Sequence, residues 1–307
     1  MQRTRTYAAG GRQIRRSSMY YDPKTDRFPY TEYTDRHYLK LKKDDGTVFD
    51  RDYPYIDRSA KRKFLEFIGR AGLVCIAMPV MAIRTGLRIK GRKKLRANRE
   101  ILRDGVVSVC NHVHMMDYIC ILNAIRPFRP HFLAWAPNVR GENGTMIRMV
   151  GGVPVPENDF HATAACIKAL ADDISAGGWL HIYAEGSMWE YYRPIRPFKT
   201  GAAYFACKCG KPILPLAYSY RKPGFIRRVI FRQIANLTVS IGEPIFPDES
   251  LKNMSDRMKD LTERAHAAVC ELAGFAPGEN IYPPVFNGNR RIDYYTSVYG
   301  IGYRGSH

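Results

Sequence analysis

The sequence predicts an α/β fold with a layered, mostly parallel sheet flanked by helices, preceded by an N-terminal helix that lies at a membrane interface. Two observations predict the sheet: from about Val106, short β-branched runs alternate with stretches of helical periodicity, and polar clusters follow two of the expected strands. A third observation predicts the interfacial helix, because the apolar segment 64–83 runs directly into a strongly basic stretch.

Composition limits the class of protein. The 307 residues include 48 Lys and Arg and 29 Asp and Glu, so the formal net charge is +19. With 45% hydrophobic and 12% aromatic residues, the chain can build a core, which excludes disordered, collagen-like and low-complexity classes. A mean hydropathy of −0.34 excludes a polytopic membrane protein. The 7 cysteines are scattered and odd in number, as expected of reduced thiols in a cytoplasm.

The N-terminal part divides into two expected regions. Residues 1–63 form a polar extension, and residues 64–100 form an apolar and basic segment that we expect to dock on a membrane. The charge-free stretch 71–83 is shorter than the about 20 residues that span a bilayer, so we expect an interfacial helix; a core helix is the alternative. No secretory signal is visible, so we expect a peripheral or monotopic protein on the cytoplasmic face of the cell membrane.

A dense basic stretch follows the apolar segment, and only Glu100 opposes it. It contains Arg84, Arg88, Lys90, Arg92, Lys93, Lys94, Arg96, Arg99 and Arg103. One interpretation is a solvated basic helix and linker. The other is a patch that binds an anionic membrane surface, which the neighbouring apolar run favours.

Residues 101–275 are expected to form the catalytic domain, and residues 276–307 an irregular tail rich in Gly, Pro and Tyr. The predicted strands are 106–110, 131–135, 152–156, 179–184, 213–218 and 237–241. The predicted helices are 117–125, 139–150, 160–176, 200–209 and 253–273. This alternation is typical of a mostly parallel sheet covered by helices.

The first polar cluster follows the strand 106–110 and contains His112 and Asp117. A His at a strand end and an Asp at the start of the next helix can face each other across the turn. The carboxylate can accept a hydrogen bond from Nδ1–H, which leaves Nε2 as a base. Such a pair can remove a proton from a hydroxyl nucleophile.

A metal site is the alternative for the same residues. The run from His112 through His114 to Asp117 superficially resembles the HxHxDH motif of metallo-β-lactamase-type hydrolases, but the Asp would have to stand at Met116. No downstream set of carboxylates and histidines completes a dinuclear site. We therefore expect no metal.

The second polar cluster follows the strand 179–184. Glu185 and Gly186 put a carboxylate and flexible backbone at the carboxyl edge of the sheet, and Arg193, Arg196 and Lys199 come next. A loop with solvated charges is the plainer interpretation of each of these residues taken alone.

Five sequence blocks together resemble the glycerolipid and lysophospholipid acyltransferases, and bacterial 1-acyl-sn-glycerol-3-phosphate acyltransferases are the most similar type. Asn111-His112 through Asp117 matches the family's NHxxxxD block, and Glu185-Gly186-Ser187 resembles its EGT block. The other three are Gly151 to Pro156, Phe198 to Ala202 and Pro212 to Leu216. All five occur in the family's order, over roughly residues 65–275.

The resemblance implies transfer of a fatty acyl group from acyl-CoA or acyl-acyl carrier protein to a lysoglycerophospholipid hydroxyl. The expected acceptor is 1-acyl-sn-glycerol-3-phosphate and the expected product is phosphatidic acid. His112 would be the general base and Asp117 would orient it. Glu185, Gly186, Ser187 and Gly152, with Lys199, Arg193 and Arg196, would bind substrate. No cofactor is implied. The expected partners are an anionic membrane surface, the lysophospholipid and acyl carrier protein.

Two arginines of the family pattern are missing here. Glu157 falls where the second block has an Arg that contacts the acceptor phosphate, and Met188 follows Ser187 where the third block has another. Arg193, Arg196 and Lys199 are candidate replacements, with Arg140 and Arg148 as further ones. A different lysolipid or a glycolipid acceptor therefore stays open, as do a non-catalytic lipid-binding relative and a thioesterase that uses water. No nucleic-acid-binding signature accompanies the charge.

Overall fold

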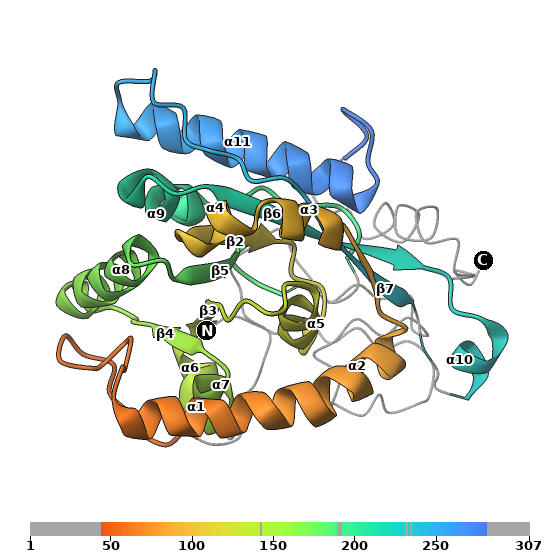
Figure 1. Ribbon diagram of the computed structural model, residues 1–307, viewed down its shortest axis with the longest axis horizontal. Helices are drawn as coiled ribbons and strands as arrows, with labels where there is room; N and C mark the ends of the chain where they lie inside the picture. Colours follow the sequence, from red (N-terminus) through yellow and green to blue (C-terminus); the bar gives the residue numbers. More distant parts are fainter. Residues whose placement is uncertain (1–43, 142, 189–191, 231–232, 234, 281–307) are drawn as a thin grey trace, which may run out of the picture.

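The computed structural model describes residues 44–280, apart from residues 142, 189–191, 231–232 and 234. Within this part of the chain, seven strands form one sheet in the order β1–β7–β6–β2–β5–β3–β4 (Figure 1). Neighbouring strands are parallel except β6 and β7, which pair antiparallel. The predicted α/β class, with a mostly parallel sheet flanked by helices, is confirmed.

The strands are short and their bounds lie close to those predicted. They are β1 (Arg88–Lys90), β2 (Val106–Cys110), β3 (His131–Trp135), β4 (Gly152–Val155), β5 (Trp179–Tyr183), β6 (Ile213–Arg221) and β7 (Asn236–Ile241). Strand β2 lies between β5 and β6, and all five of its residues are buried. Near-continuous apolar runs are expected of parallel strands covered on both faces.

Alternate residues of the central strands face two different cores. Val107 and Val109 of β2 join a core formed with α8 (Phe160–Ser175), α9 (Gly201–Cys209) and α11 (Met254–Ala273). Val106 and Cys110 face the opposite core, which includes α5 (Asp117–Ala124) and the N-terminal helix. The period of two in a strand separates these sets, so the sheet is the middle layer of three.

The N-terminal helix is continuous from Ala60 to Thr85 and is built from α1 (Ala60–Gly72), the π-helical turn η2 (Leu73–Ala77) and α2 (Met78–Thr85). By length and composition it could cross a membrane, so the length argument from the charge-free stretch alone was too strict. Only 17% of its most apolar window is buried, which opposes the alternative of a core helix. The helix lies along the lower edge of the domain instead of projecting from it (Figure 1).

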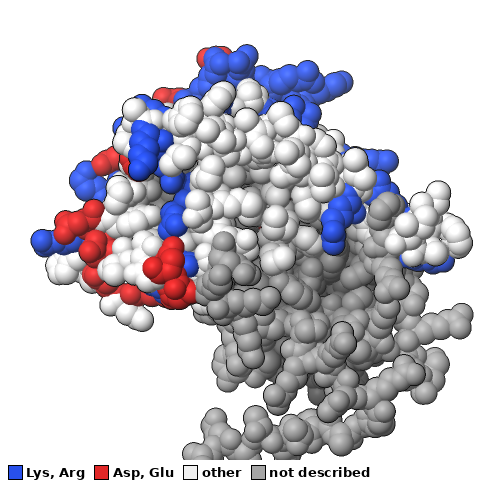
Figure 2. Space-filling view, turned by 90° about the horizontal axis from the view of Figure 1, so that it is seen from below, with Lys and Arg blue, Asp and Glu red and all other residues white. Residues whose placement is uncertain are grey.

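One side of this helix packs on the domain and the other is exposed. Leu73, Met78 and Met81 are buried in the core beside α5. The exposed side carries Phe64, Leu65, Phe67, Ile68, Val74, Ile76, Val80 and Ile83. We call these eight residues the apolar helix face. Seen from below, the described surface is mostly uncharged over its middle, with Lys and Arg along its margin and a cluster of Asp and Glu at the left (Figure 2).

Two predicted segments differ from the structure, and one short helix was not predicted. The single helix 139–150 is instead two helices, α6 (Ala136–Arg140) and α7 (Gly144–Met149). The chain turns so tightly between them that a Cβ on Gly144 would lie 1.8 Å from the carbonyl oxygen of Val139. The basic stretch is a strand and two short helices, β1, α3 (Arg92–Ala97) and α4 (Arg99–Arg103). The five-residue helix α10 (Phe225–Val229) was not predicted.

The proposed ends of the domain are only partly visible. Residues 1–43 of the predicted polar extension and residues 281–307 of the predicted tail lie outside the described residues. The described remainder of the extension packs on the domain, with Phe49 and Tyr55 buried. The boundaries at residues 63, 100 and 275 stay predictions.

Candidate active site

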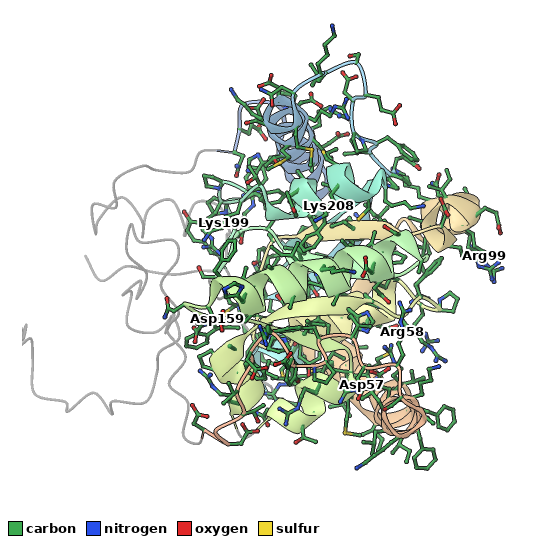
Figure 3. All side chains as sticks on the ribbon, turned by 90° about the vertical axis from the view of Figure 1, so that its left-hand side faces the viewer. Asp57, Arg58, Arg99, Asp159, Lys199 and Lys208 are labelled. Carbon is green, nitrogen blue, oxygen red and sulfur yellow. The ribbon has the colours of Figure 1, made fainter. Side chains whose placement is uncertain are left out.

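The site forms where strands β2 and β5 end. Both strands run in the same direction, with Cys110 opposite Tyr183 in the register, so the polar residues that follow them meet at one edge. Lys199 and Asp159, which follow β5 and β4 in the chain, lie at this edge of the sheet, and Arg99 lies at the opposite edge (Figure 3). Carboxyl ends of parallel strands are where open α/β sheets bind ligands.

His112 and Asp117 face each other as their spacing predicts. The Nδ1 atom of His112 lies 2.8 Å from Oδ2 of Asp117, and the imidazole is 22% exposed while the carboxylate is completely buried. The same Oδ2 accepts backbone N–H bonds from Val113 and His114, at 3.0 and 3.2 Å. Asp117 is the first residue of α5, so the turn that starts the helix also wraps the carboxylate.

Burial alone would raise the pKa of Asp117, but the positive charge that His112 can carry and the hydrogen bonds from His112, Tyr183 and Val113 outweigh it. The pKa of Asp117 is therefore held below its ordinary value, and the group is a carboxylate at neutral pH. A carboxylate only accepts hydrogen bonds, so Nδ1 of His112 carries the proton. The lone pair of His112 then resides on Nε2.

Tyr183 is a site residue that the sequence analysis missed. Its hydroxyl donates a 2.6 Å hydrogen bond to Oδ1 of Asp117. Its ring stacks on the imidazole of His112 with centroids 3.9 Å apart and planes 12° apart. The signal was available in the strand alternation, which puts Tyr183 on the same face as His181 and Trp179, toward α5.

Asn111 and Tyr218 fix the backbone of the turn. Asn111 accepts from the Tyr218 backbone N–H at 2.8 Å and donates to the Tyr218 carbonyl at 3.3 Å. The Tyr218 hydroxyl donates to the Asp117 carbonyl at 2.6 Å. The end of β2 and the start of α5 are thus fastened to β6, which limits motion of His112 relative to Asp117.

Glu185 and Arg196 form a buried ion pair behind the site. Arg196 Nη2 lies 2.9 Å from Glu185 Oε2, and the two side chains are 1% and 3% exposed. Glu185 also accepts the backbone N–H of His112 at 3.1 Å, and Arg196 Nη1 donates to Ser187 Oγ at 2.9 Å. This network joins the loop after β5 to the loop after β2, and it holds the backbone of His112 from residues that do not line the cavity.

A mostly apolar cavity of about 410 Å³ opens beside His112 and Asp117. Its polar wall comes from Gly186, Ser187 and Lys199. Its apolar wall includes Phe132, Leu133, Trp135, Ile147, Val155 and Phe205. A cavity of this size and polarity suits an elongated apolar group with one polar end.

The other predicted binding residues lie elsewhere. Gly152 is buried in β4, where a Cβ would lie 2.4 Å from Ile147 Cγ2, and it does not line the cavity. The guanidinium of Arg193 lies over the ring of Phe275, 4.9 Å from its centroid. The structure therefore brings His112 and Asp117 together with Gly186, Ser187 and Lys199, and it puts Glu185 and Arg196 behind them.

Each remaining candidate for the missing phosphate arginines has an observed partner. Arg140 pairs with Asp44 and with Glu157, both at 3.4 Å, and Arg148 pairs with Asp45 at 3.4 Å. Glu157 itself also accepts from Trp135 Nε1 at 2.8 Å. Among the described residues, no group of three His, Cys, Asp or Glu side chains is arranged to hold a metal ion.

Taken together, the fold and the site define an α/β protein with a His–Asp pair at the carboxyl edge of its sheet and an apolar cavity beside it. Residues 86–219, which include this pair and the β5 loop, match the family model described as Acyltransferase. Over these residues the chain is similar to the acyltransferases, and the resemblance predicted from the sequence blocks is confirmed.

One solved structure similar to this chain is the crystal structure of the 1-acyl-sn-glycerophosphate (LPA) acyltransferase, PlsC, from Thermotoga maritima. The identity is 18%, the match covers 72% of this chain and 86% of that chain, and the TM-score is 0.45. No curated protein matches the chain.

Proposed function

We propose that this acyltransferase transfers a fatty acyl group from a CoA or acyl carrier protein thioester to the hydroxyl of a lysoglycerophospholipid. The observation that carries the proposal is the 2.8 Å contact between His112 and Asp117 at the side of a mostly apolar cavity. The cavity suits the acyl chain, and the pair suits activation of a hydroxyl.

In the proposed step, Nε2 of His112 takes the proton of the acceptor hydroxyl while the oxygen attacks the thioester carbonyl. A carbon–oxygen bond forms, the carbon–sulfur bond breaks, and the proton on Nε2 passes to the leaving thiolate. Asp117 holds the imidazole with Nδ1 protonated and stabilises the imidazolium that forms transiently. The step balances without a metal or a redox cofactor.

The proposed acceptor is 1-acyl-sn-glycerol-3-phosphate, which gives phosphatidic acid. Of the five basic residues considered as replacements for the missing arginines, Lys199 is the one that lines the cavity. Its ammonium could receive the acceptor phosphate, because a cation beside a low-dielectric wall attracts a phosphate strongly. Arg196 supports this polar wall through Ser187 instead of meeting the substrate.

The apolar helix face suits docking on the cytoplasmic face of the cell membrane, where both the lysolipid and the product reside. The N-terminal helix also packs on an element that builds the cavity. Gly69 of α1 closely approaches Met149 of α7, and Ile147 of α7 lines the cavity. The exposed basic residues at the margin favour anionic lipid and acidic acyl carrier protein.

The first test is an acyl-transfer assay by mass spectrometry on the full chain in mixed micelles. Palmitoyl-CoA or palmitoyl-acyl carrier protein would be offered with lysophosphatidate, lysophosphatidylcholine, lysophosphatidylglycerol and a glycolipid. His112→Gln should lower kcat by about 10²–10⁴-fold. His161→Gln, an exposed histidine on α8, is the matched control and should keep normal turnover. Turnover that survives His112→Gln would refute the mechanism, and intact thioester with every acceptor would refute the activity.

A second pair of variants tests the acceptor. Lys199→Met should lower kcat/KM for lysophosphatidate by about 10-fold or more, since a charge-assisted hydrogen bond contributes about 1.5–3 kcal/mol. Lys199→Arg should restore much of that loss. Equal losses for lysophosphatidate and for a neutral acceptor would show that Lys199 does not read the phosphate.

A further inference from the structure

Helix α10 exposes an unusual amount of apolar surface for so short an element. Phe225, Ile226, Val229 and the following Ile230 are 73%, 64%, 53% and 68% exposed, and no residue of the helix is buried. These four residues, which we call the α10 patch, lie on the connection between β6 and β7. Contiguous exposed apolar side chains on a surface mark an interaction site.

Two arginines, one at the end of β6 and one in α10, donate hydrogen bonds to backbone carbonyls at the C-terminal end of the N-terminal helix. Arg227 Nη1 donates to the carbonyl oxygen of Ile83, and Arg221 Nη2 donates to the carbonyl oxygen of Gly86. Arg221 Nε also donates to Thr238 Oγ1 at 2.8 Å, which ties the same arginine to β7. The patch is therefore held at the C-terminal end of α2, and Figure 1 shows α10 beyond that end on the same lower side of the molecule.

The α10 patch lies near the C-terminal end of the apolar helix face. Val80 and Ile83, which are 54% and 64% exposed, end that face beside the carbonyl that Arg227 binds. Exposed basic residues stand beside these apolar ones in the sequence: Arg84 follows Ile83, and Lys222 and Arg228 stand before and within α10. Apolar side chains flanked by Lys and Arg are typical of segments that enter the headgroup region of an anionic bilayer.

We propose that the α10 patch is a second membrane contact, which inserts into the headgroup region of a bilayer that contains anionic lipids. The proposal rests on the membrane docking proposed for the apolar helix face. A single helix touches a flat surface along a line, and the domain could still roll about that line. A second contact away from the helix axis stops the roll, so α10 fixes which way the catalytic cavity faces relative to the lipid.

The test is sedimentation of the full chain with vesicles of phosphatidylcholine and phosphatidylglycerol in a 3:1 ratio, beside vesicles of phosphatidylcholine alone. Phe225→Ser/Ile230→Ser should weaken binding to the anionic vesicles by about 10–100-fold, the loss expected for two large apolar side chains. Phe160→Ser is the matched control, because Phe160 is 81% exposed on α8, away from the junction. The control should bind as the wild type does.

A second measurement separates lipid contact from other roles of the patch. Phe225→Trp should gain fluorescence that brominated lipids quench, relative to the wild-type protein with the same vesicles. Unchanged binding of Phe225→Ser/Ile230→Ser together with no quenching would overturn the proposal. If the wild type is a dimer and Phe225→Ser/Ile230→Ser a monomer, with no quenching of Phe225→Trp, the result would also overturn the proposal, in favour of self-association.

A third variant distinguishes this inference from the proposed docking helix. Phe67→Ser/Ile76→Ser alters the apolar helix face and leaves α10 intact. Normal vesicle binding by this variant would contradict docking through α1 and α2. If this variant loses binding and the α10 variant does not, docking through the helix stands and the role of α10 fails.

Discussion

The hydroxyl of Tyr183 donates a 2.6 Å hydrogen bond to Asp117, on the carboxylate oxygen that His112 does not use. The same tyrosine stacks on His112, so one side chain holds both members of the pair. Burial first, and then the negative charge of Asp117, raise the pKa of Tyr183 well above 10, so its hydroxyl stays protonated and donates throughout the physiological range.

Tyr183→Phe should therefore separate the hydrogen bond from the stacking. The ring remains over His112, while the carboxylate loses a donor worth about 1.5–3 kcal/mol in such charged bonds. We expect kcat to fall about 10-fold with little change in KM for the thioester. We also expect the pKa of Asp117 to rise, which NMR of a carboxyl-labelled protein can follow. Tyr204→Phe removes a hydroxyl of a half-buried tyrosine on α9 that accepts a hydrogen bond from Lys208, so it is the control and should leave both unchanged.

His181 should make stability depend on pH from about pH 6.5 downward, starting above the range where most Asp and Glu side chains titrate. It is buried beside Ser108, whose Oγ lies 2.8 Å from His181 Nδ1, and burial lowers the pKa of His181 to about 3. The unfolded chain takes up this proton near pH 6.5. Between pH 6.5 and 3 the unfolded state binds more protons, so the free energy of unfolding falls as the pH falls.

Urea unfolding at several pH values can measure this slope. His181→Gln should unfold with a shallower dependence on pH between 6.5 and 4 than the wild type. The exposed His161→Gln should keep the wild-type slope. Equal slopes for all three proteins would mean that His181 does not stay neutral in the folded state.

Removal of one partner of the buried Glu185–Arg196 pair should lower the free energy of unfolding strongly. Arg196→Met leaves Glu185 3% exposed without its ionic partner, so we expect a loss of about 3–5 kcal/mol in the free energy of unfolding. Lys168→Met breaks a pair with Asp172 whose side chains are 76% and 61% exposed, and it should change stability by under about 1 kcal/mol. A similar small effect for both variants would contradict a positioning role for the buried pair.

Gly144 and Gly201 offer a matched comparison of two glycines that each begin a helix. At Gly144 a Cβ would meet the Val139 carbonyl oxygen at 1.8 Å, whereas at Gly201 it would meet nothing within 4 Å. Gly144→Ala should therefore destabilise the fold by more than about 2 kcal/mol, while Gly201→Ala should be neutral or slightly stabilising. Thermal unfolding of both variants is sufficient, and equal midpoints would refute the tight turn between α6 and α7.

The sequence predicts most strands closely because their apolar runs are bounded by turn residues, as at Val106–Cys110 and Trp179–Tyr183. It also predicts that the side chains of His112 and Asp117 face each other, because the two residues are only five positions apart in one turn. Helix 139–150 was wrong because the contact between Gly144 and Val139 depends on a local fold that helical periodicity does not record. The short α10 carries no periodic signal of its own.

The residues that line the cavity were harder to predict than the contact between His112 and Asp117, for a physical reason. An arginine that already forms an ion pair with a nearby carboxylate is less available to bind an anionic substrate. Arg140 and Arg148 are paired with Asp44 and Asp45, roughly a hundred residues earlier in the chain. Arg196 is paired with Glu185 and is buried. Such pairings are set by the tertiary fold, so charge and position in a motif could not predict which basic residue lines the cavity, as Lys199 does.

The place of the N-terminal helix in the chain has a consequence for biosynthesis. The helix ends at Thr85, and the last strand of the described sheet, β7, ends 156 residues later, at Ile241 (241 − 85 = 156). At about 5–20 residues per second, roughly 8–30 seconds of translation separate the two. During that interval Leu73, Met78 and Met81 lack the finished core that later covers them. Nascent chains should therefore expose these apolar side chains before the sheet is complete, so the membrane docking proposed above would have time to begin on the ribosome.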